Sequence, residues 1–129
     1  MSQASDRPAR VVFLDRDTIS PETVLRELSF PHELEVFDRT TAEQVAERIR
    51  DADIVITNKA PVRGAALERA KRLRLVAVAA TGTDVVDVKA ANARGVTVSN
   101  IRNYAVNTVP EHTFALLLAL RRSIVAYRE

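Results

Sequence analysis

Short apolar runs recur along the chain and alternate with segments whose apolar residues follow helical spacing. Runs such as VVFL from residue 11 and IVIT from residue 54 are typical of strands that a parallel sheet buries on both faces. Each of these two runs ends at a polar residue, which marks the start of a loop. The predicted strands cover residues 11–15, 34–37, 54–57, 75–79 and 96–98.

Between these runs the sequence carries helix start signals. Thr40 with Glu43 and Thr41 with Gln44 form two overlapping capping boxes, in which each side chain satisfies a free backbone N–H of the other residue. Apolar residues then follow at helical spacing, which predicts a helix from residue 42. The other predicted short helices follow Ser20-Pro21, cover residues 64–72, and run from an Asp87 cap to a left-handed turn at Gly95.

The longest helical pattern covers residues 108–125. Thr108 and Glu111 form a capping box, and Pro110 falls in the first turn, where its missing N–H costs little. Every residue of 114–120 is apolar, so we expect this helix to be buried on several sides. The run is far shorter than the ~20 residues that span a bilayer, and we therefore expect no membrane association.

Strands that alternate with helices predict a doubly wound α/β fold with helices on both faces of a parallel sheet. Five strands favour the flavodoxin-like order 2-1-3-4-5, in which ligands bind at the carboxyl edge. We expect the loops 15–20, 57–61, 81–84 and 100–107 to line one crevice at that edge. The 129 residues predict a single domain, with a polar leader over 1–10, a flavodoxin-like part over 11–107 and the long helix over 108–129.

Composition narrows the classes of function. Nineteen basic and 17 acidic residues are interleaved to a net charge of +2, and aromatic residues make up 5% with no Trp, so we expect no nucleic-acid partner. The chain has no cysteine, which excludes disulfides and cysteine-based metal sites or nucleophiles. The first residues, MSQASDRPAR, lack an apolar signal segment, and we expect a cytoplasmic protein.

The turn Thr81-Gly82-Thr83-Asp84 follows a predicted buried strand. A glycine at this point allows backbone N–H groups to approach a small anion closely, and Lys59 in the neighbouring loop adds positive charge. The same residues also fit an ordinary strand-to-helix turn beside a solvated lysine.

Acidic and histidine side chains offer weaker candidates. Asp15 and Asp17 follow the first strand in an Asp-x-Asp-x-Thr pattern that resembles Mg²⁺-dependent haloacid-dehalogenase phosphatases, and the acidic pair also resembles response-regulator receivers. Neither match is complete, since later acidic residues are missing where those proteins need them. His112 lies beside Glu111, but adjacent helical residues point about 100° apart and do not form a dyad, and we expect His32 at the surface.

Three segments together carry a more specific pattern. In their order and spacing, TNKAPV, AATGTDVVDVKAANARGVTVSN and NYAVNTVPEHTFALLLALRR resemble the N-terminal substrate-binding (catalytic) domain of D-isomer-specific 2-hydroxyacid dehydrogenases. The likeness is greatest to the glycerate dehydrogenase/hydroxypyruvate reductase branch. It implies a flavodoxin-like domain whose long helix leads into an NAD(P)-binding Rossmann domain, with the active site between the two domains.

The resemblance also implies roles for individual residues. It places the substrate carboxylate on backbone N–H groups around Gly82, with Lys59 and Tyr104 nearby and Thr108 near the nicotinamide. The full set is Lys59, Thr81, Gly82, Thr83 and Tyr104 for substrate, and Thr108 for cofactor. The family's dinucleotide fingerprint and its catalytic Arg, Glu and His come after the long helix, so we expect no catalytic residue and no metal site in this chain.

These implications lead to a functional hypothesis. The chain resembles the truncated substrate-binding part of an enzyme that transfers hydride between NAD or NADP and a small 2-keto acid such as hydroxypyruvate or glyoxylate. We expect no cofactor bound to this chain alone, no activity alone, and a homo-oligomer formed through the 108–125 helix. The alternative is a stand-alone, non-catalytic binding or interaction module, and a Gly-x-Gly-x-x-Gly motif just downstream in the reading frame would separate the two.

Overall fold

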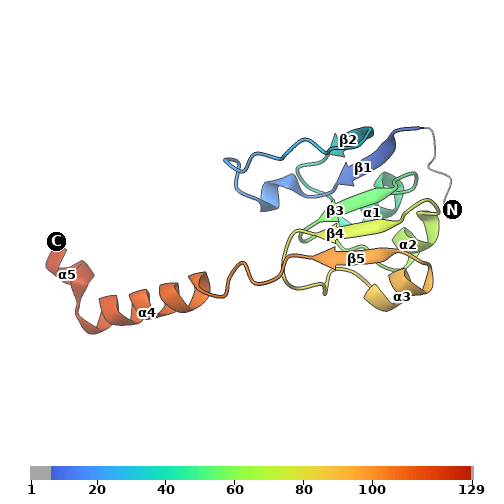
Figure 1. The fold of residues 1–129 in the computed structure, drawn as a ribbon. Helices are drawn as coiled ribbons and strands as arrows, with labels where there is room; N and C mark the ends of the chain where they lie inside the picture. Colours follow the sequence, from blue (N-terminus) through green and yellow to red (C-terminus); the bar gives the residue numbers. More distant parts are fainter. Residues whose placement is uncertain (1–6, 129) are drawn as a thin grey trace.

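The computed structural model describes residues 7–128 and contains a five-stranded sheet in the order β2-β1-β3-β4-β5 (Figure 1). All four neighbouring strand pairs are parallel, so the predicted α/β class and strand order are confirmed. The strands are Ala9–Phe13 (β1), His32–Val36 (β2), Ile54–Thr57 (β3), Leu75–Val78 (β4) and Thr97–Asn100 (β5). Their bounds differ from the predicted ones by up to two residues.

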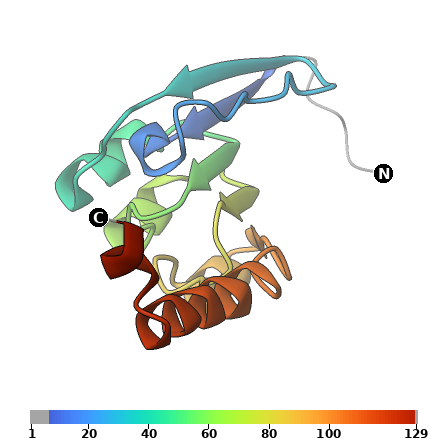
Figure 2. The ribbon, with the colours of Figure 1, turned by 90° about the vertical axis from the view of Figure 1, so that its left-hand side faces the viewer.

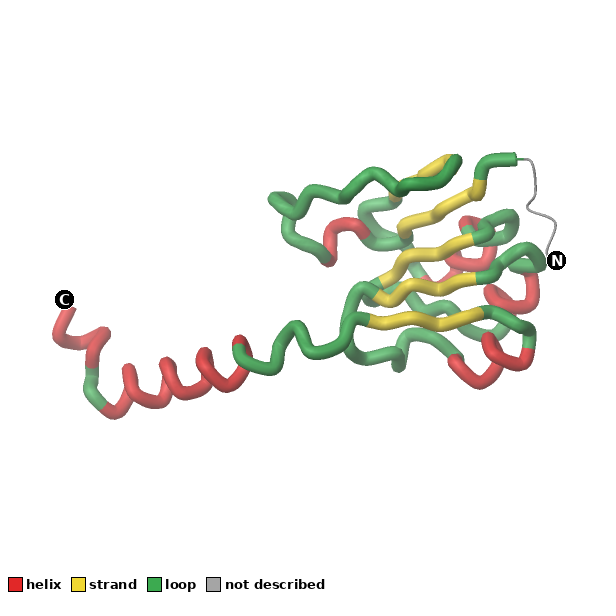
Figure 3. Tube along the Cα trace, viewed as in Figure 1, coloured by secondary structure: helices red, strands yellow, loops and turns green. Residues whose placement is uncertain are grey.

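Three helices lie together on one face of the sheet (Figure 3). They are Ala42–Arg48 (α1), Ala65–Arg69 (α2) and Val88–Ala93 (α3). Each belongs to a crossover that advances in the same direction across the sheet, and right-handed crossovers of that kind place their helices on a common face. The core therefore lies between this face and these helices. Helices were expected on both faces, but these three crossovers place all of their helices on one face.

The two faces of the central strands differ in burial. Val55 and Val76 are fully buried beneath the helices, whereas Ile54 and Leu75, one position earlier in each strand, are only half-buried. Successive side chains in a strand point to opposite faces, so the second face is covered only in part by residues 7–128.

The crossover from β1 to β2, residues 14–31, contains no α-helix. The predicted helix after Ser20-Pro21 is wrong: the segment contains a short 3-10 helix, Arg16–Thr18 (η1), followed by turns and extended chain. The Arg16 guanidinium donates to the carbonyls of Ile19, Ser20 and Thr23 at 3.0, 3.2 and 2.8 Å. These carbonyls are satisfied by a side chain, so the segment has no need of helical hydrogen bonds.

Helix α1 shows which of the two overlapping capping boxes forms. The Thr41–Gln44 box is present, and Gln44 Oε1 accepts from the Thr41 N–H at 3.0 Å. The Thr40–Glu43 box is not, because the Thr40 hydroxyl donates to the carbonyl of Leu14 at the end of β1. That bond ties the chain after β2 to β1.

The caps of α3 are as predicted. Asp87 accepts from the Ala90 N–H at 2.9 Å, and Gly95 has the left-handed φ of +73°. Helix α2 is shorter than predicted, since the Ala70 N–H still donates to Ala66 but the next N–H, of Lys71, donates to Arg69 in a tighter turn.

The long C-terminal helical segment extends away from the sheet (Figures 1 and 2). It consists of Thr108–Arg121 (α4) and Ile124–Arg128 (α5), separated by a left-handed Ser123 with φ +51°. No residue of α4 is buried in the described structure, and Leu120 is 80% exposed. Residues 7–128 do not cover this helix, so the expected burial is not met within the chain, and its expected continuity to residue 125 is wrong because Ser123 interrupts it.

The start of α4 also differs from the prediction. Asn107 already has helical backbone angles, and its carbonyl accepts from the Glu111 N–H at 3.0 Å. Thr108 therefore lies inside the helix, where its hydroxyl faces the Tyr104 carbonyl at 3.5 Å, and it forms no capping box with Glu111. Among the described helices, none has the length and apolar character needed to span a membrane.

Candidate functional site

The loops after β3 and β4 lie next to each other at the carboxyl edge of the sheet. The Ala79 N–H donates to the Thr57 carbonyl at 2.8 Å, just beyond the last residues of both strands. Farther along, Val62 forms a parallel bridge with Val86. The Lys59 loop and the Gly82 turn lie between these two tie points and are therefore neighbours.

Two carbonyl groups of the turn at residues 81–84 accept hydrogen bonds. The Thr81 carbonyl accepts from Asn100 Nδ2 at 2.7 Å, which ties the turn to the end of β5. The Thr83 carbonyl accepts from the Val86 N–H at 2.9 Å and closes the turn before α3. Within the described part of the chain, the N–H groups of residues 81–83 donate no hydrogen bond. Exposed, unpaired N–H groups on a fixed turn are what an anion requires.

Gly82 lies beside the side chain of Asp84. A Cβ built on Gly82 would be 2.8 Å from Asp84 Oδ1, so a side chain there would require this exposed carboxylate to move. Asp84 places a negative charge next to the turn. Lys59, in the adjacent loop, supplies the opposite charge.

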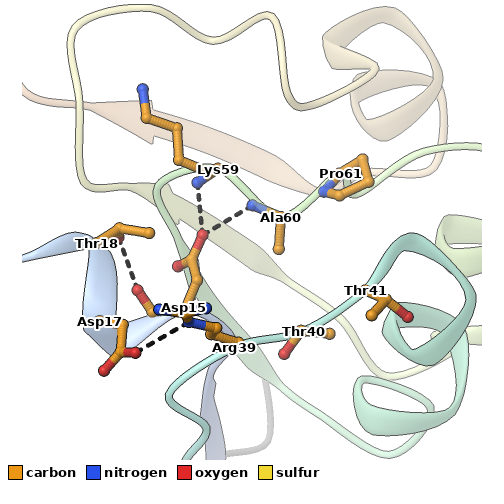
Figure 4. Close-up of a pocket in the computed structure, with 9 residues that line it drawn as sticks. All are labelled: Asp15, Asp17, Thr18, Arg39, Thr40, Thr41, Lys59, Ala60 and Pro61. Carbon is orange, nitrogen blue, oxygen red and sulfur yellow. Dashed lines mark hydrogen bonds and ion pairs between the residues drawn. The ribbon is translucent and has the colours of Figure 1, made fainter.

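The backbone and the side chain of Lys59 have different surroundings. Its N–H donates to Asp15 Oδ2 at 2.5 Å, while its side chain extends away from that carboxylate (Figure 4). The side chain is exposed, and its ammonium group has no hydrogen bond or ion pair to any of residues 7–128. It is therefore available to a ligand at this edge.

Asp15 is the buried carboxylate of the edge, 4% exposed. It accepts from the N–H groups of Asn58, Lys59 and Ala60 at 2.9, 2.5 and 2.8 Å. The Thr57 hydroxyl lies 3.4 Å from the same group. Sequence reasoning assigned Asp15 to a polar loop and missed this role, although its position directly after a buried strand was a signal.

Tyr104 and Thr108 lie in the segment that follows β5, and among residues 7–128 their side chains form no hydrogen bond with the Lys59 loop or the 81–84 turn. Tyr104 is 61% exposed and lies in the turn that leads from β5 into α4, and Thr108 is the first residue of α4. Both belong to the segment that leaves the sheet (Figure 1).

The two histidines also lie away from the edge. His32 is the first residue of β2, at the opposite end of the sheet, where its Nδ1 is 2.8 Å from the Phe30 carbonyl. His112 lies on exposed α4 beside Glu111. Neither is placed to exchange a proton with a ligand at Lys59 and Gly82.

A hollow of about 480 Å³ lies next to the Asp15 cluster (Figure 4). Segments that follow β1, β2 and β3 line it. The lining residues are Asp15, Asp17, Thr18, Arg39, Thr40, Thr41, Lys59, Ala60 and Pro61. Of the four loops expected to share one crevice, 15–20 and 57–61 line this hollow, and residues 81–84 and 100–107 do not. Sequence reasoning missed the part contributed by residues 39–41, although these also follow a strand at the same edge.

The geometry of the hollow does not fit a magnesium site. The Asp15 carboxylate is occupied by backbone N–H groups, and Asp17 forms an ion pair with Arg39 at 3.1 Å. Among residues 7–128 there is no group of three or more His, Asp or Glu side chains placed to hold a metal ion. The phosphatase-like and receiver-like hypotheses for Asp15 and Asp17 therefore have no support in this geometry.

Comparison with known proteins assigns the family. Residues 11–126 match the family described as D-isomer specific 2-hydroxyacid dehydrogenase, catalytic domain. This match covers most of the 129 residues, and the chain belongs to this family.

Curated relatives carry related enzyme names. The chain is 53% identical over 119 residues to the glycerate dehydrogenase of Methylorubrum extorquens, covering 92% of this chain and 37% of that protein. It is 39% identical to the hydroxypyruvate reductase of Blautia hydrogenotrophica, covering 86% and 36%. The chain thus spans a little over a third of the length of these relatives.

Solved structures agree at the level of the fold. An acyclic imino acid reductase in complex with NADPH and D-Arg superposes with a TM-score of 0.76 at 28% identity, covering 93% of this chain and 39% of that one. An NADPH-dependent glyoxylate/hydroxypyruvate reductase from Sinorhizobium meliloti, in complex with NADP and malonate, gives 0.61 at 28% identity, covering 88% and 34%.

Proposed function

We propose that this chain is the substrate-binding part of an NAD(P)-dependent D-2-hydroxyacid dehydrogenase acting on hydroxypyruvate, glyoxylate or a similar small 2-keto acid. The observation that carries the proposal is the turn at residues 81–83, whose N–H groups donate no hydrogen bond to residues 7–128 while the carbonyls of Thr81 and Thr83 are engaged. The glycerate dehydrogenase and hydroxypyruvate reductase names of the relatives support this substrate class.

In this proposal the substrate carboxylate accepts hydrogen bonds from the N–H groups of Thr81, Gly82 and Thr83. Hydrogen bonds to a charged group contribute roughly 1.5–3 kcal/mol each, of which desolvation offsets a large part. The Lys59 ammonium lies beside the carboxylate and adds a further attraction. Tyr104 contacts the substrate from the segment after β5.

The cofactor of the complete enzyme is NAD or NADP, which supplies the hydride chemistry. The residues of this chain do not fit the dinucleotide, since its three glycines are Gly64, Gly82 and Gly95 and do not form the Gly-x-Gly-x-x-Gly cradle for a pyrophosphate. Thr108 contributes at most a contact near the nicotinamide. We therefore expect the chain alone to bind and orient substrate without catalysing the reaction.

The partner we propose for α4 is a second copy of the chain. Leu116, Leu117 and Leu118 are each 53% exposed, and Leu120 is 80% exposed. A contiguous apolar surface of this kind is rare on soluble monomers, and exchange of a terminal helix between identical chains is a common route to its burial.

Titration of the ¹⁵N-labelled chain with hydroxypyruvate, followed by NMR, tests the proposal. We expect the amides of residues 81–83 to shift with a Kd of about 1 mM or weaker. This corresponds to a binding free energy of about −4 kcal/mol or a less favourable value. Lys59→Met should weaken binding by about two- to five-fold, the range for one exposed charge pair.

Lys71→Met is the matched control, since Lys71 is exposed before β4 at the opposite edge of the sheet. It should leave the Kd unchanged. The same samples with NADH added should show no NADH oxidation. If hydroxypyruvate leaves the amides of residues 81–83 unshifted, the proposed function is contradicted.

A further inference from the structure

The loop after β3 contains an anion cradle that is already filled by the protein itself. The consecutive N–H groups of Asn58, Lys59 and Ala60 all point to the Asp15 carboxylate, and Oδ2 alone accepts from all three, at 3.1, 2.5 and 2.8 Å. Converging N–H groups of this kind form a concave anion site. Ala60 and Thr57 are buried beside it, so water has little access.

Asp15 is itself held firmly in place. The preceding Leu14 N–H donates to the Ile56 carbonyl of β3 at 3.0 Å. The Asp15 carbonyl accepts from both the hydroxyl and the N–H of Thr18, at 2.7 and 3.1 Å. The carboxylate is therefore a fixed point at the end of β1, and the neighbouring loop adapts to it.

The cradle fixes the position of the Lys59 backbone. Its N–H is bonded to the fixed carboxylate, and its side chain leaves in the other direction (Figure 4). Two residues later the chain reaches Pro61 and then Val62, whose N–H donates to the Val85 carbonyl at 2.9 Å. The Lys59 backbone is thus clamped between Asp15 and the segment that follows the 81–84 turn.

We propose that Asp15 is a positioning residue: its carboxylate is the internal ligand of the 58–60 cradle and holds Lys59 beside the substrate carboxylate. This inference rests on the proposed function for the identity of the ligand. Asp15 does not touch the substrate and acts only through the loop.

A second buried carboxylate provides a matched control. Asp53 is also 4% exposed and also accepts a backbone N–H, from Arg10 at 2.9 Å. It lies at the start of β3, at the edge of the sheet opposite to Lys59. Loss of Asp53 therefore perturbs the fold without altering the 58–60 cradle.

A double-mutant cycle tests the inference through the Kd of hydroxypyruvate. Asp15→Asn removes the negative charge and one of the two acceptor oxygens, so the three N–H groups are held less firmly and binding should weaken by about two- to five-fold, as in Lys59→Met. The double variant should be no weaker than either single variant, and Asp53→Asn should leave the Kd unchanged. Additive effects of Asp15→Asn and Lys59→Met, or an equal loss in Asp53→Asn, would overturn the inference.

Chemical rescue supplies a test that is independent of the substrate. Asp15→Ala empties the cradle, and formate has the size and charge of the group removed. Formate should return the amide shifts of residues 58–60 toward their wild-type positions, and acetamide, which is neutral, should not. Failure of formate to restore these amides in a folded variant overturns the inference, and Asp15→Gly serves if the alanine variant does not fold. If wild-type protein binds no hydroxypyruvate, the proposed function fails while this experiment still decides the role of Asp15.

Discussion

Asp15 and Asp53 are equally buried, yet they satisfy their carboxylates in different ways. Asp15 uses N–H groups of a single loop. Asp53 combines one N–H with ion pairs to Arg7 and Arg72, at 2.8 and 3.2 Å, whose side chains are 43% and 41% exposed. Loss of Asp53 leaves its two exposed arginines free to bond to water. Loss of Asp15 leaves the N–H donors of a half-buried loop without an acceptor, which costs about 1–3 kcal/mol of stability for each donor that is buried.

Glu43 provides a pH-dependent prediction at the residue scale. A hydrogen bond from the Thr41 hydroxyl holds the pKa of Glu43 below its ordinary value of 4.5, and the backbone N–H of Glu43 itself adds a smaller effect in the same direction. The carboxylate therefore contributes stability that is complete above pH 4.5 and is lost as the pH falls through the lower pKa of the folded state. Thr41→Val should raise the pKa of Glu43 toward 4.5.

An NMR titration of the Glu43 side chain against pH measures this shift. Thr40→Val is the matched control, since the Thr40 hydroxyl donates to the Leu14 carbonyl instead, and it should leave the pKa of Glu43 low. An unchanged pKa in Thr41→Val would show that the hydroxyl is not the cause.

At the scale of elements, capping signals between residues three positions apart predicted only some of the helix starts, and the Thr108–Glu111 box does not form because the helix already begins at Asn107. The Thr41–Gln44 box and the Asp87 cap depend on residues three positions apart, and both form. The helix expected after Ser20-Pro21 does not form, and the Arg16 guanidinium instead holds the carbonyls of Ile19, Ser20 and Thr23 in an irregular turn. The Thr40–Glu43 box does not form, since the Thr40 hydroxyl donates to the carbonyl of Leu14, 26 residues earlier in the chain.

Helix α4 provides a prediction at the element scale. Leu116→Glu with Leu120→Glu should abolish self-association, because both side chains are exposed and carry apolar surface that a second copy would cover. The free energy of unfolding should change by no more than about 0.5 kcal/mol, as is usual for exposed positions. Sedimentation velocity measures the association.

Val24→Glu is the control, since Val24 is 86% exposed on the β1–β2 crossover, far along the chain from α4. It should leave the association state unchanged. A wild-type chain that remains monomeric at high micromolar concentration would contradict the proposed role of α4.

At the scale of the whole molecule, the sheet topology was predictable and the shape of the site was only partly so. The periodicity of buried runs and the right-handed crossover rule predict the order 2-1-3-4-5 and bring the Lys59 and Gly82 loops to one edge. The hollow beside Asp15 was missed, because Arg39 and Thr40 reach it from the chain after β2. The exposure of α4 within the chain was not predictable, since an apolar pattern shows that a helix needs a partner but not where the partner is.

The position of bound hydroxypyruvate decides whether the 81–83 turn holds the substrate carboxylate. A crystal structure of the chain soaked in hydroxypyruvate should show its carboxylate about 2.7–3.2 Å from the N–H groups of Thr81, Gly82 and Thr83, with the Lys59 ammonium turned toward it. Hydroxypyruvate bound instead in the hollow lined by Asp17 and Arg39, with the 81–83 turn empty, would contradict the proposed substrate site.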